Sequence, residues 1–193
     1  MLYSEENLKN SYINNKRMIA KINAALFPFL KIELKKYEDY KCDAFLYIKN
    51  KKTKLEIKQR LTKNLTKSKL YNNIYIHKSS IDHTDAEFYM IYGSEYNTIM
   101  IFSTKDVDRS KYKTIRTKKG EMIDMYEIEL SKCQIINIEE ILKNKTIKQI
   151  VEYVKTLDID DTEDIIKMIA RVNNMTQEEL LLTLIEYTKK GSY

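Results

Sequence analysis

The chain has 193 residues, of which 43% are hydrophobic and 32% charged, with a formal net charge of +6. This length supports one full domain, and the hydrophobic content excludes an intrinsically disordered chain. No window reaches the about 18 apolar residues that a membrane span needs, and the N-terminus lacks the pattern of a secretory signal, so no membrane partner is expected. Two cysteines are too few for a disulfide framework, and we expect a cytoplasmic protein with free thiols.

The positive charge is unevenly distributed along the chain. Residues 31–69 contain thirteen Lys or Arg against five acids, and residues 105–119 contain seven against two. Clustered cations favour a polyanionic partner, because each neutralised phosphate releases counterions. For the charge taken alone, ordinary solvated lysines are the alternative explanation.

The first predicted element is a long amphipathic helix over residues 4–26, with Ser4 as its capping residue. Pro28 favours an end to the helix just before it. The apolar residues that recur at helical spacing are Leu8, Tyr12, Ile19, Ile22 and Leu26.

Residues 43–59 predict a β-hairpin, because the apolar runs DAFLYI and KLEIKQ flank the polar turn KNKKT. Glu56 and Lys58 are two residues apart on the second strand, so they share one face. Leu55 and Ile57 point to the opposite, apolar face. The hairpin therefore carries a charged pair on a strand that otherwise resembles core.

The register of this hairpin decides whether Asp43 can join the charged pair. If Asn50 and Lys51 form a two-residue turn, residue 43 faces residue 58 across the hairpin. Directly opposed residues share a face, so Asp43 is expected beside Lys58 and diagonal to Glu56.

Three more short strands follow, in the segments IYIH, EFYMIY and TIMIFS, and end near residue 104. A basic, mobile loop is expected over residues 105–120, before one further strand in MIDMYEIEL. Helical spacing replaces the strand pattern from residue 138, and Thr176 with Glu179 forms a capping box. The expected helices cover residues 138–157, 162–173 and 176–190.

This order of elements predicts an α/β fold with a mixed central sheet flanked by helices. A core over residues 1–137 is followed by a helical C-terminal extension over residues 138–193. The extension packs on the core or forms a dimer interface. Because its helices carry more apolar faces than one sheet easily covers, we expect a homodimer joined through them. The apolar positions concerned are Ile147, Ile150, Val154, Ile165, Ile169, Leu180 and Leu184.

Two carboxylates and one ammonium group suit the cleavage of a phosphodiester. Carboxylate oxygens are hard ligands that hold Mg²⁺, which keeps several waters and can also bind a phosphate oxygen. The metal ion acidifies a bound water, while the ammonium group orients or deprotonates the nucleophile and neutralises the transition state. Asp43, Glu56 and Lys58 supply these groups, and Mn²⁺ is expected to substitute for Mg²⁺.

The segment CDAFLYIKNKKTKLEIKQR resembles the core of the PD-(D/E)XK (restriction-endonuclease-like) nuclease superfamily, whose members place an Asp on one strand and an acid-x-Lys on the next. The resemblance covers about residues 4–104 and implies Asp43 and Glu56 as metal ligands and Lys58 as the catalytic lysine. Cys42 stands where the family's nominal Pro would be. For the helix acid that many members carry, Glu6 is favoured among four candidates, Glu5, Glu6, Glu33 and Glu38.

Six further residues are candidates for nucleic-acid binding, because Arg and Lys suit phosphate groups and these residues follow the hairpin or lie in the basic segments. They are Gln59, Arg60, Lys63, Lys67, Arg109 and Lys111. We therefore expect a magnesium-dependent DNA nuclease, and within that class an endonuclease. Two alternatives stay open: a catalytically inactive nucleic-acid-binding protein of the same fold, and a protein-interaction module.

Overall fold

The computed structural model describes residues 5–35, 42–48, 51–60, 73–93, 97–117, 120–156 and 159–190. The protein is an α/β protein with a mixed central sheet, as expected. It divides into two compact units, one formed by Met1–Ile32 with Asn137–Tyr193 and the other by Glu33–Ile136. The second unit thus ends next to the expected division at residue 137, whereas the N-terminal helix groups with the C-terminal helices.

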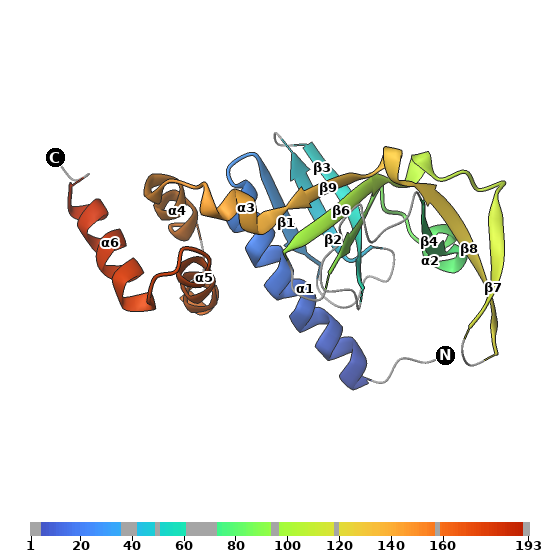
Figure 1. Ribbon diagram of the computed structural model, residues 1–193, viewed down its shortest axis with the longest axis horizontal. Coiled ribbons are helices and arrows are strands. Elements are labelled where there is room, and N and C mark those ends of the chain that lie inside the picture. Colours follow the sequence, from blue (N-terminus) through green and yellow to red (C-terminus); the bar gives the residue numbers. More distant parts are fainter. Residues whose placement is uncertain are drawn as a thin grey trace. The chain divides into compact units, whose positions relative to one another are not determined.

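The first unit is helical (Figure 1). Its helices are α1 (Glu5–Leu26), α3 (Ile138–Lys143), α4 (Ile147–Val154), α5 (Ile159–Val172) and α6 (Gln177–Lys190). Helix α1 packs against α3 and α5, and α6 packs against α4 and α5. Met18, Ile22 and Ala25 recur at helical spacing on the buried face of α1. The expected helix is confirmed over Glu5–Leu26, with its end two residues before Pro28, whereas Ser4, its expected capping residue, lies outside the described residues.

The capping box of α6 is confirmed. The Glu179 carboxylate accepts a hydrogen bond of 2.7 Å from the N–H of Thr176, and the Thr176 hydroxyl accepts one of 3.1 Å from the N–H of Glu179. The single helix expected over residues 138–157 is wrong, because α3 ends before Asn144 and Thr146 starts α4 with a second capping box.

Most apolar positions expected at a dimer interface are buried inside this helical unit, because α1 and the neighbouring helices cover them. The buried positions are Ile150, Ile165, Ile169, Leu180 and Leu184. These apolar faces are thus covered by other helices of the same unit rather than by a sheet, and the expected homodimer stays a prediction. Helix α6 exposes other apolar side chains, those of Leu181, Leu182 and Ile185.

The second unit contains most of the β-structure. Its strands and short helices are β2 (Ala44–Ile48), β3 (Lys51–Gln59), β4 (Asn73–His77), α2 (Lys78–Asp82), β5 (Phe88–Tyr92), β6 (Thr98–Ser103), η1 (Thr104–Asp106), β7 (Tyr112–Arg116), β8 (Met122–Glu129) and η2 (Leu130–Lys132). Two further strands were not predicted from the sequence: β1 (Leu30–Leu34) and β9 (Gln134–Asn137). The chain passes from one unit to the other within each of these two strands.

The larger sheet has the strand order β1-β2-β3-β5-β6-β9. Strand β3 is antiparallel to β2 and parallel to β5, and β5 is antiparallel to β6. A parallel pair needs a crossover connection, and the chain between β3 and β5 contains β4 and α2. The three strands expected in this region, IYIH, EFYMIY and TIMIFS, are confirmed as β4, β5 and β6.

The expected hairpin is confirmed, but its register is wrong by two residues. Ile48 pairs with Lys51 and Ala44 pairs with Leu55, so Lys51 belongs to the ladder and cannot form the turn with Asn50. The two residues between the strands lie outside the described ranges. Because side chains alternate with a period of two, a shift of two residues leaves each side chain on the face that was expected.

The smaller sheet has the order β4-β8-β7 and joins segments that lie about fifty residues apart in the sequence. The strand expected in MIDMYEIEL is confirmed as β8. The loop expected over residues 105–120 is wrong in part, because η1 extends into this segment and β7 lies within it. Strand β7 pairs with β8 along all five of its residues, which gives this basic segment a regular backbone.

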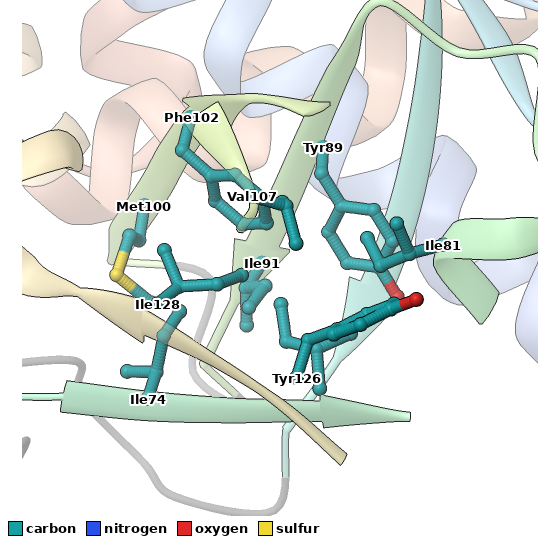
Figure 2. Close-up of a cluster of buried hydrophobic side chains, with 10 residues drawn as sticks. Ile74, Ile81, Tyr89, Ile91, Met100, Phe102, Val107, Tyr126 and Ile128 are labelled. Atoms are coloured by element: carbon teal, nitrogen blue, oxygen red, sulfur yellow. The ribbon is translucent and has the colours of Figure 1, made fainter. Parts of the chain in front are cut away.

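The core of this unit lies between the two sheets. Figure 2 shows the side chains of β5 and β6 meeting those of β4, α2 and β8. The cluster consists of Ile74, Ile76, Ile81, Tyr89, Ile91, Met100, Phe102, Val107, Tyr126 and Ile128. The rings of Tyr89 and Phe102 stack within it, with centroids 5.3 Å apart. Within the described ranges, no helix combines the length and apolar composition needed to cross a membrane.

Candidate active site

Strand β3 places Glu56 and Lys58 on one face of the larger sheet. The strand has a period of two, so Leu55 and Ile57 point to the other face, where both are buried. Glu56 is itself buried, with 9% of its surface exposed, whereas Lys58 is half-buried. The expected separation of charged and apolar faces is thus present on this strand.

Asp43 precedes β2 and reaches the same site from across the hairpin. Its backbone N–H donates to the carbonyl of Leu55 at 3.1 Å. One oxygen of its carboxylate accepts a hydrogen bond of 2.7 Å from the N–H of Ile57 and lies 3.7 Å from Lys58 Nζ. Asp43 therefore lies close to Lys58, as expected. The hairpin register, continued by one residue, sets Asp43 opposite Glu56 and diagonal to Lys58, which is the reverse of the expected arrangement.

The Lys58 ammonium group lies close to both carboxylates. Its Nζ donates to Glu56 Oε1 at 2.6 Å and lies 3.7 Å from Asp43 Oδ2. Burial alone would lower the pKa of Lys58, but the charges of Asp43 and Glu56 outweigh burial and raise this pKa above its ordinary value. Lys58 is therefore positively charged at neutral pH and neutralises part of the charge of the two acids.

The pKa of Glu56 is raised above its ordinary value. Burial is the main cause and the nearby charge of Asp43 adds to it, while the Lys58 ammonium opposes the shift. Thr84 also stabilises the ionised form, because its hydroxyl donates to Glu56 Oε2 at 3.2 Å. The same hydroxyl accepts from the N–H of Ala86 at 3.1 Å, which fixes Thr84 at the start of the chain segment leading to β5.

Tyr89 connects the site to the hydrophobic core. It is the direct partner of Glu56 in the parallel ladder between β3 and β5, so both side chains lie on the same face. Its side chain is 1% exposed, and burial raises its pKa to about 12. Sequence reasoning did not assign Thr84 or Tyr89 to the site, because no local pattern indicates that β5 pairs with β3.

Arg60 follows β3 and shares the face of Glu56 and Lys58. Its guanidinium group donates to the backbone carbonyl of Tyr75 at 2.8 Å, and burial lowers its pKa. Within the described part of the chain, no carboxylate pairs with this guanidinium group. Gln59 is exposed and points to the opposite face, away from the three charged residues.

The other candidates for nucleic-acid binding lie away from the β3 strand or outside the described residues. Arg109 and Lys111 are exposed in the segment before β7, where Lys111 pairs with Asp108 at 3.3 Å. Lys63 and Lys67 belong to a segment that the structure does not describe. Glu6 lies in α1, but its side chain is outside the described part of the structure, so its proposed role as an additional acid stays a prediction.

The donor set at this site is compatible with Mg²⁺. Among the described residues, no group of three or more His, Cys, Asp or Glu side chains could hold a metal ion. Magnesium, however, is usually held by one or two carboxylates together with waters and substrate phosphates. Asp43 and Glu56 provide two carboxylates whose mutual repulsion a divalent cation would relieve.

No family model matches this chain and no curated protein matches its sequence, so comparison with known proteins assigns it neither a family nor a function. The chemical character of the site therefore rests on its own geometry. Two acids, a charged lysine and a guanidinium group share one face of a rigid sheet, and such an arrangement can bind a cation and a phosphate group together.

Proposed function

We propose that this protein is a magnesium-dependent DNA endonuclease with a restriction-endonuclease-like fold. The observation that carries the proposal is the position of Lys58 Nζ, which lies 2.6 Å from Glu56 and 3.7 Å from Asp43. Two carboxylates and one ammonium group supply what metal-assisted hydrolysis of a phosphodiester requires from the protein. The element order supports the fold assignment, because a helix precedes the hairpin and β5 and β6 follow it, as the resemblance to the superfamily implies.

Asp43 and Glu56 would hold the metal ion through their carboxylate oxygens, with Mn²⁺ as a substitute for Mg²⁺. When bound, the ion would supply an acidified water and stabilise negative charge on the phosphate. The hydrogen bond from Ile57 holds Asp43 in place, and the hydroxyl of Thr84 holds Glu56. Both acids are thus positioned by groups on the rigid sheet or directly before β5.

Lys58 acts in this proposal as a positive charge rather than as a base. Because the two acids raise its pKa, the side chain keeps its proton at neutral pH. An ammonium group beside the metal site stabilises the charge that develops on the phosphate and orients the attacking water. Arg60 extends the positive charge along the same face, where its guanidinium group is suited to phosphate oxygens.

The proposal places the enzyme in the cytoplasm, where its two free cysteines, Cys42 and Cys133, stay reduced. A polyanionic substrate is supported by the net charge of +6 and by two basic segments, residues 31–69, which contain the site, and residues 105–119.

Incubation of the purified protein with closed circular and linear duplex DNA tests the proposed function. With Mg²⁺ or Mn²⁺ we expect nicking or linearisation of the circle, and with a chelator we expect none. Binding of DNA without cleavage in any metal would indicate the catalytically inactive nucleic-acid-binding protein. Absence of any salt-sensitive DNA affinity would instead indicate the protein-interaction module.

A further inference from the structure

The face of the β2–β3 hairpin that carries the candidate active site continues into two aromatic side chains. Phe45 and Tyr47 follow Asp43 at steps of two residues, so all three side chains share one face. In the ladder, Phe45 pairs with Lys54 and Tyr47 with Lys52. Successive side chains on one face of a strand are about 7 Å apart, so Phe45 lies next to a proposed metal ligand. We call Phe45 and Tyr47 the aromatic pair.

The aromatic pair lies outside the buried core of the described residues. Both rings are half-buried, whereas Ala44 and Leu46, which point to the opposite face of β2, are completely buried. The hairpin thus has one face that packs into the core and one face on which part of each ring stays accessible. An accessible ring on the face of a charged site can take part in binding.

Two lysine ammonium groups lie near the aromatic pair. Lys52 Nζ is 3.8 Å from the centre of the Phe45 ring and 5.7 Å from the centre of the Tyr47 ring. Lys35 Nζ is 5.2 Å from the centre of the Phe45 ring. Lys52 is exposed, and among the described residues no carboxylate lies within ion-pair distance of it. The rings are therefore accompanied by positive charge that an anionic ligand can use.

Aromatic rings and cations on one strand face suit unpaired nucleotides. An unpaired base can stack on an aromatic ring while the phosphate of the same nucleotide contacts a nearby ammonium group. In a duplex, neighbouring base pairs cover both faces of each base, so a duplex cannot stack on the rings in this way. A cation–π contact is weak at an exposed position, so Lys52 can leave the Phe45 ring for a phosphate oxygen.

We infer that the aromatic pair stacks on unpaired bases directly beside the bond that the enzyme cleaves. With the scissile phosphate at Lys58, the substrate strand would continue along the hairpin over Phe45 and Tyr47, and Lys52 would contact a flanking phosphate. The inference rests on the proposed function for the position of the scissile phosphate, and it adds that the substrate is single-stranded there. A closed circular duplex provides such a segment where negative supercoiling opens its strands.

Fluorescence anisotropy of the full chain in chelator tests the inference, with a labelled single strand of about 20 nucleotides and the duplex of the same sequence as probes. We expect Phe45→Leu combined with Tyr47→Leu to weaken single-strand binding by about tenfold and duplex binding much less. Tyr47→Phe keeps the ring and should retain the wild-type affinity. Phe88→Leu is the matched control, because the half-buried Phe88 pairs with Leu55 on the opposite face of the same sheet. It should leave both affinities unchanged.

Unchanged single-strand affinity in the double variant, with an unchanged melting curve by circular dichroism, would overturn the inference. Equal losses for single strand and duplex would also overturn it, because contact with the sugar-phosphate backbone alone explains them. If the double variant melts at a lower temperature, Tyr47→Leu is compared with Tyr47→Phe instead. Equal single-strand affinities of these two variants would then refute stacking on the ring.

Cleavage assays with Mg²⁺ or Mn²⁺ separate this inference from the proposed function. Cleavage by the wild-type protein, together with wild-type single-strand affinity in the double variant, would refute the role of the aromatic pair and leave the nuclease standing. Single-strand binding that depends on the two rings, without cleavage in any metal, would support stacking and refute the nuclease.

Discussion

The carboxylate of Asp43 accepts a hydrogen bond of 2.7 Å from the backbone N–H of Ile57. Asp43 lies directly before β2. This hydrogen bond therefore joins a proposed metal ligand at the start of β2 to the centre of β3, the strand that carries Glu56 and Lys58. The position of Asp43 therefore depends on its oxygen as a hydrogen-bond acceptor, whereas its proposed metal-binding role depends on its charge.

Two substitutions at Asp43 should separate these contributions. Asp43→Asn keeps an oxygen that can accept from Ile57, so we expect the free energy of unfolding to change little while metal-dependent cleavage is lost. Asp43→Ala leaves the buried N–H of Ile57 without its acceptor and should also lower the free energy of unfolding by about 1–2 kcal/mol. Urea unfolding and cleavage assays measure both effects. Wild-type cleavage in Asp43→Asn would contradict the assignment.

Glu56→Gln and Lys58→Ala should each reduce cleavage by about 100-fold or more, because each removes a charge from the proposed reaction centre. Lys54→Ala is a matched control, since Lys54 lies on the same strand and face but pairs with Asp85, 3.2 Å away. We expect the control to cleave at the wild-type rate. Equal rates for Lys58→Ala and Lys54→Ala, with unchanged circular dichroism, would exclude Lys58 from the site.

Metal affinity should depend on pH through Glu56. A protonated carboxyl group cannot bind Mg²⁺, so affinity falls as the pH drops through the pKa of this residue. Because burial and Asp43 raise this pKa, the loss should begin at a higher pH than for an ordinary glutamate. Thr84→Val removes a hydrogen bond to the ionised form and should move the loss to a still higher pH.

Calorimetric titration with Mg²⁺ or Mn²⁺ over a series of pH values measures this dependence. Thr53→Val is the control, because the Thr53 hydroxyl is buried on β3 but donates to the Leu46 carbonyl, at 3.2 Å, and not to Glu56. Identical pH profiles for Thr84→Val and the wild-type protein would show that Thr84 does not position Glu56.

The basic segments should contribute to DNA binding without regard to base sequence. Replacing Lys63, Lys67, Arg109 and Lys111 together with Gln should weaken binding to all sequences and flatten the plot of log affinity against log salt. The slope should change by about one unit for each phosphate group that the variant no longer neutralises. Anisotropy titrations at several salt concentrations measure the slope. A slope equal to that of the wild-type protein would assign these side chains to solubility alone.

A homodimer joined through the C-terminal helices stays a prediction, now centred on α6. Leu182 and Ile185 are 56% and 47% exposed there. Leu182→Glu should convert the expected dimer to a monomer in light scattering, because it places a charge within the apolar contact. Phe29→Glu, at an apolar side chain that is 74% exposed outside α6, should leave the dimer intact. A monomeric wild-type protein would refute the prediction.

The sequence alone determined the elements whose signals are local. The apolar spacing in α1, the alternation in β3 and the exchange of hydrogen bonds between Thr176 and Glu179 each depend on residues within a few positions of one another. Periodicity and capping residues therefore predict them. The shared face of Glu56 and Lys58 is predictable for the same reason. The prediction of side-chain faces across the hairpin was correct although the predicted register was wrong, because the register error was an even number of residues.

Only the tertiary structure decided which distant segments meet. The parallel pairing of β5 with β3 brings Thr84 and Tyr89 to Glu56, and the pairing of β4 with β8 joins strands separated by about fifty residues. Each pairing depends on packing between surfaces that no short window of sequence contains. The grouping of α1 with the C-terminal helices likewise depends on apolar faces from both ends of the chain covering each other.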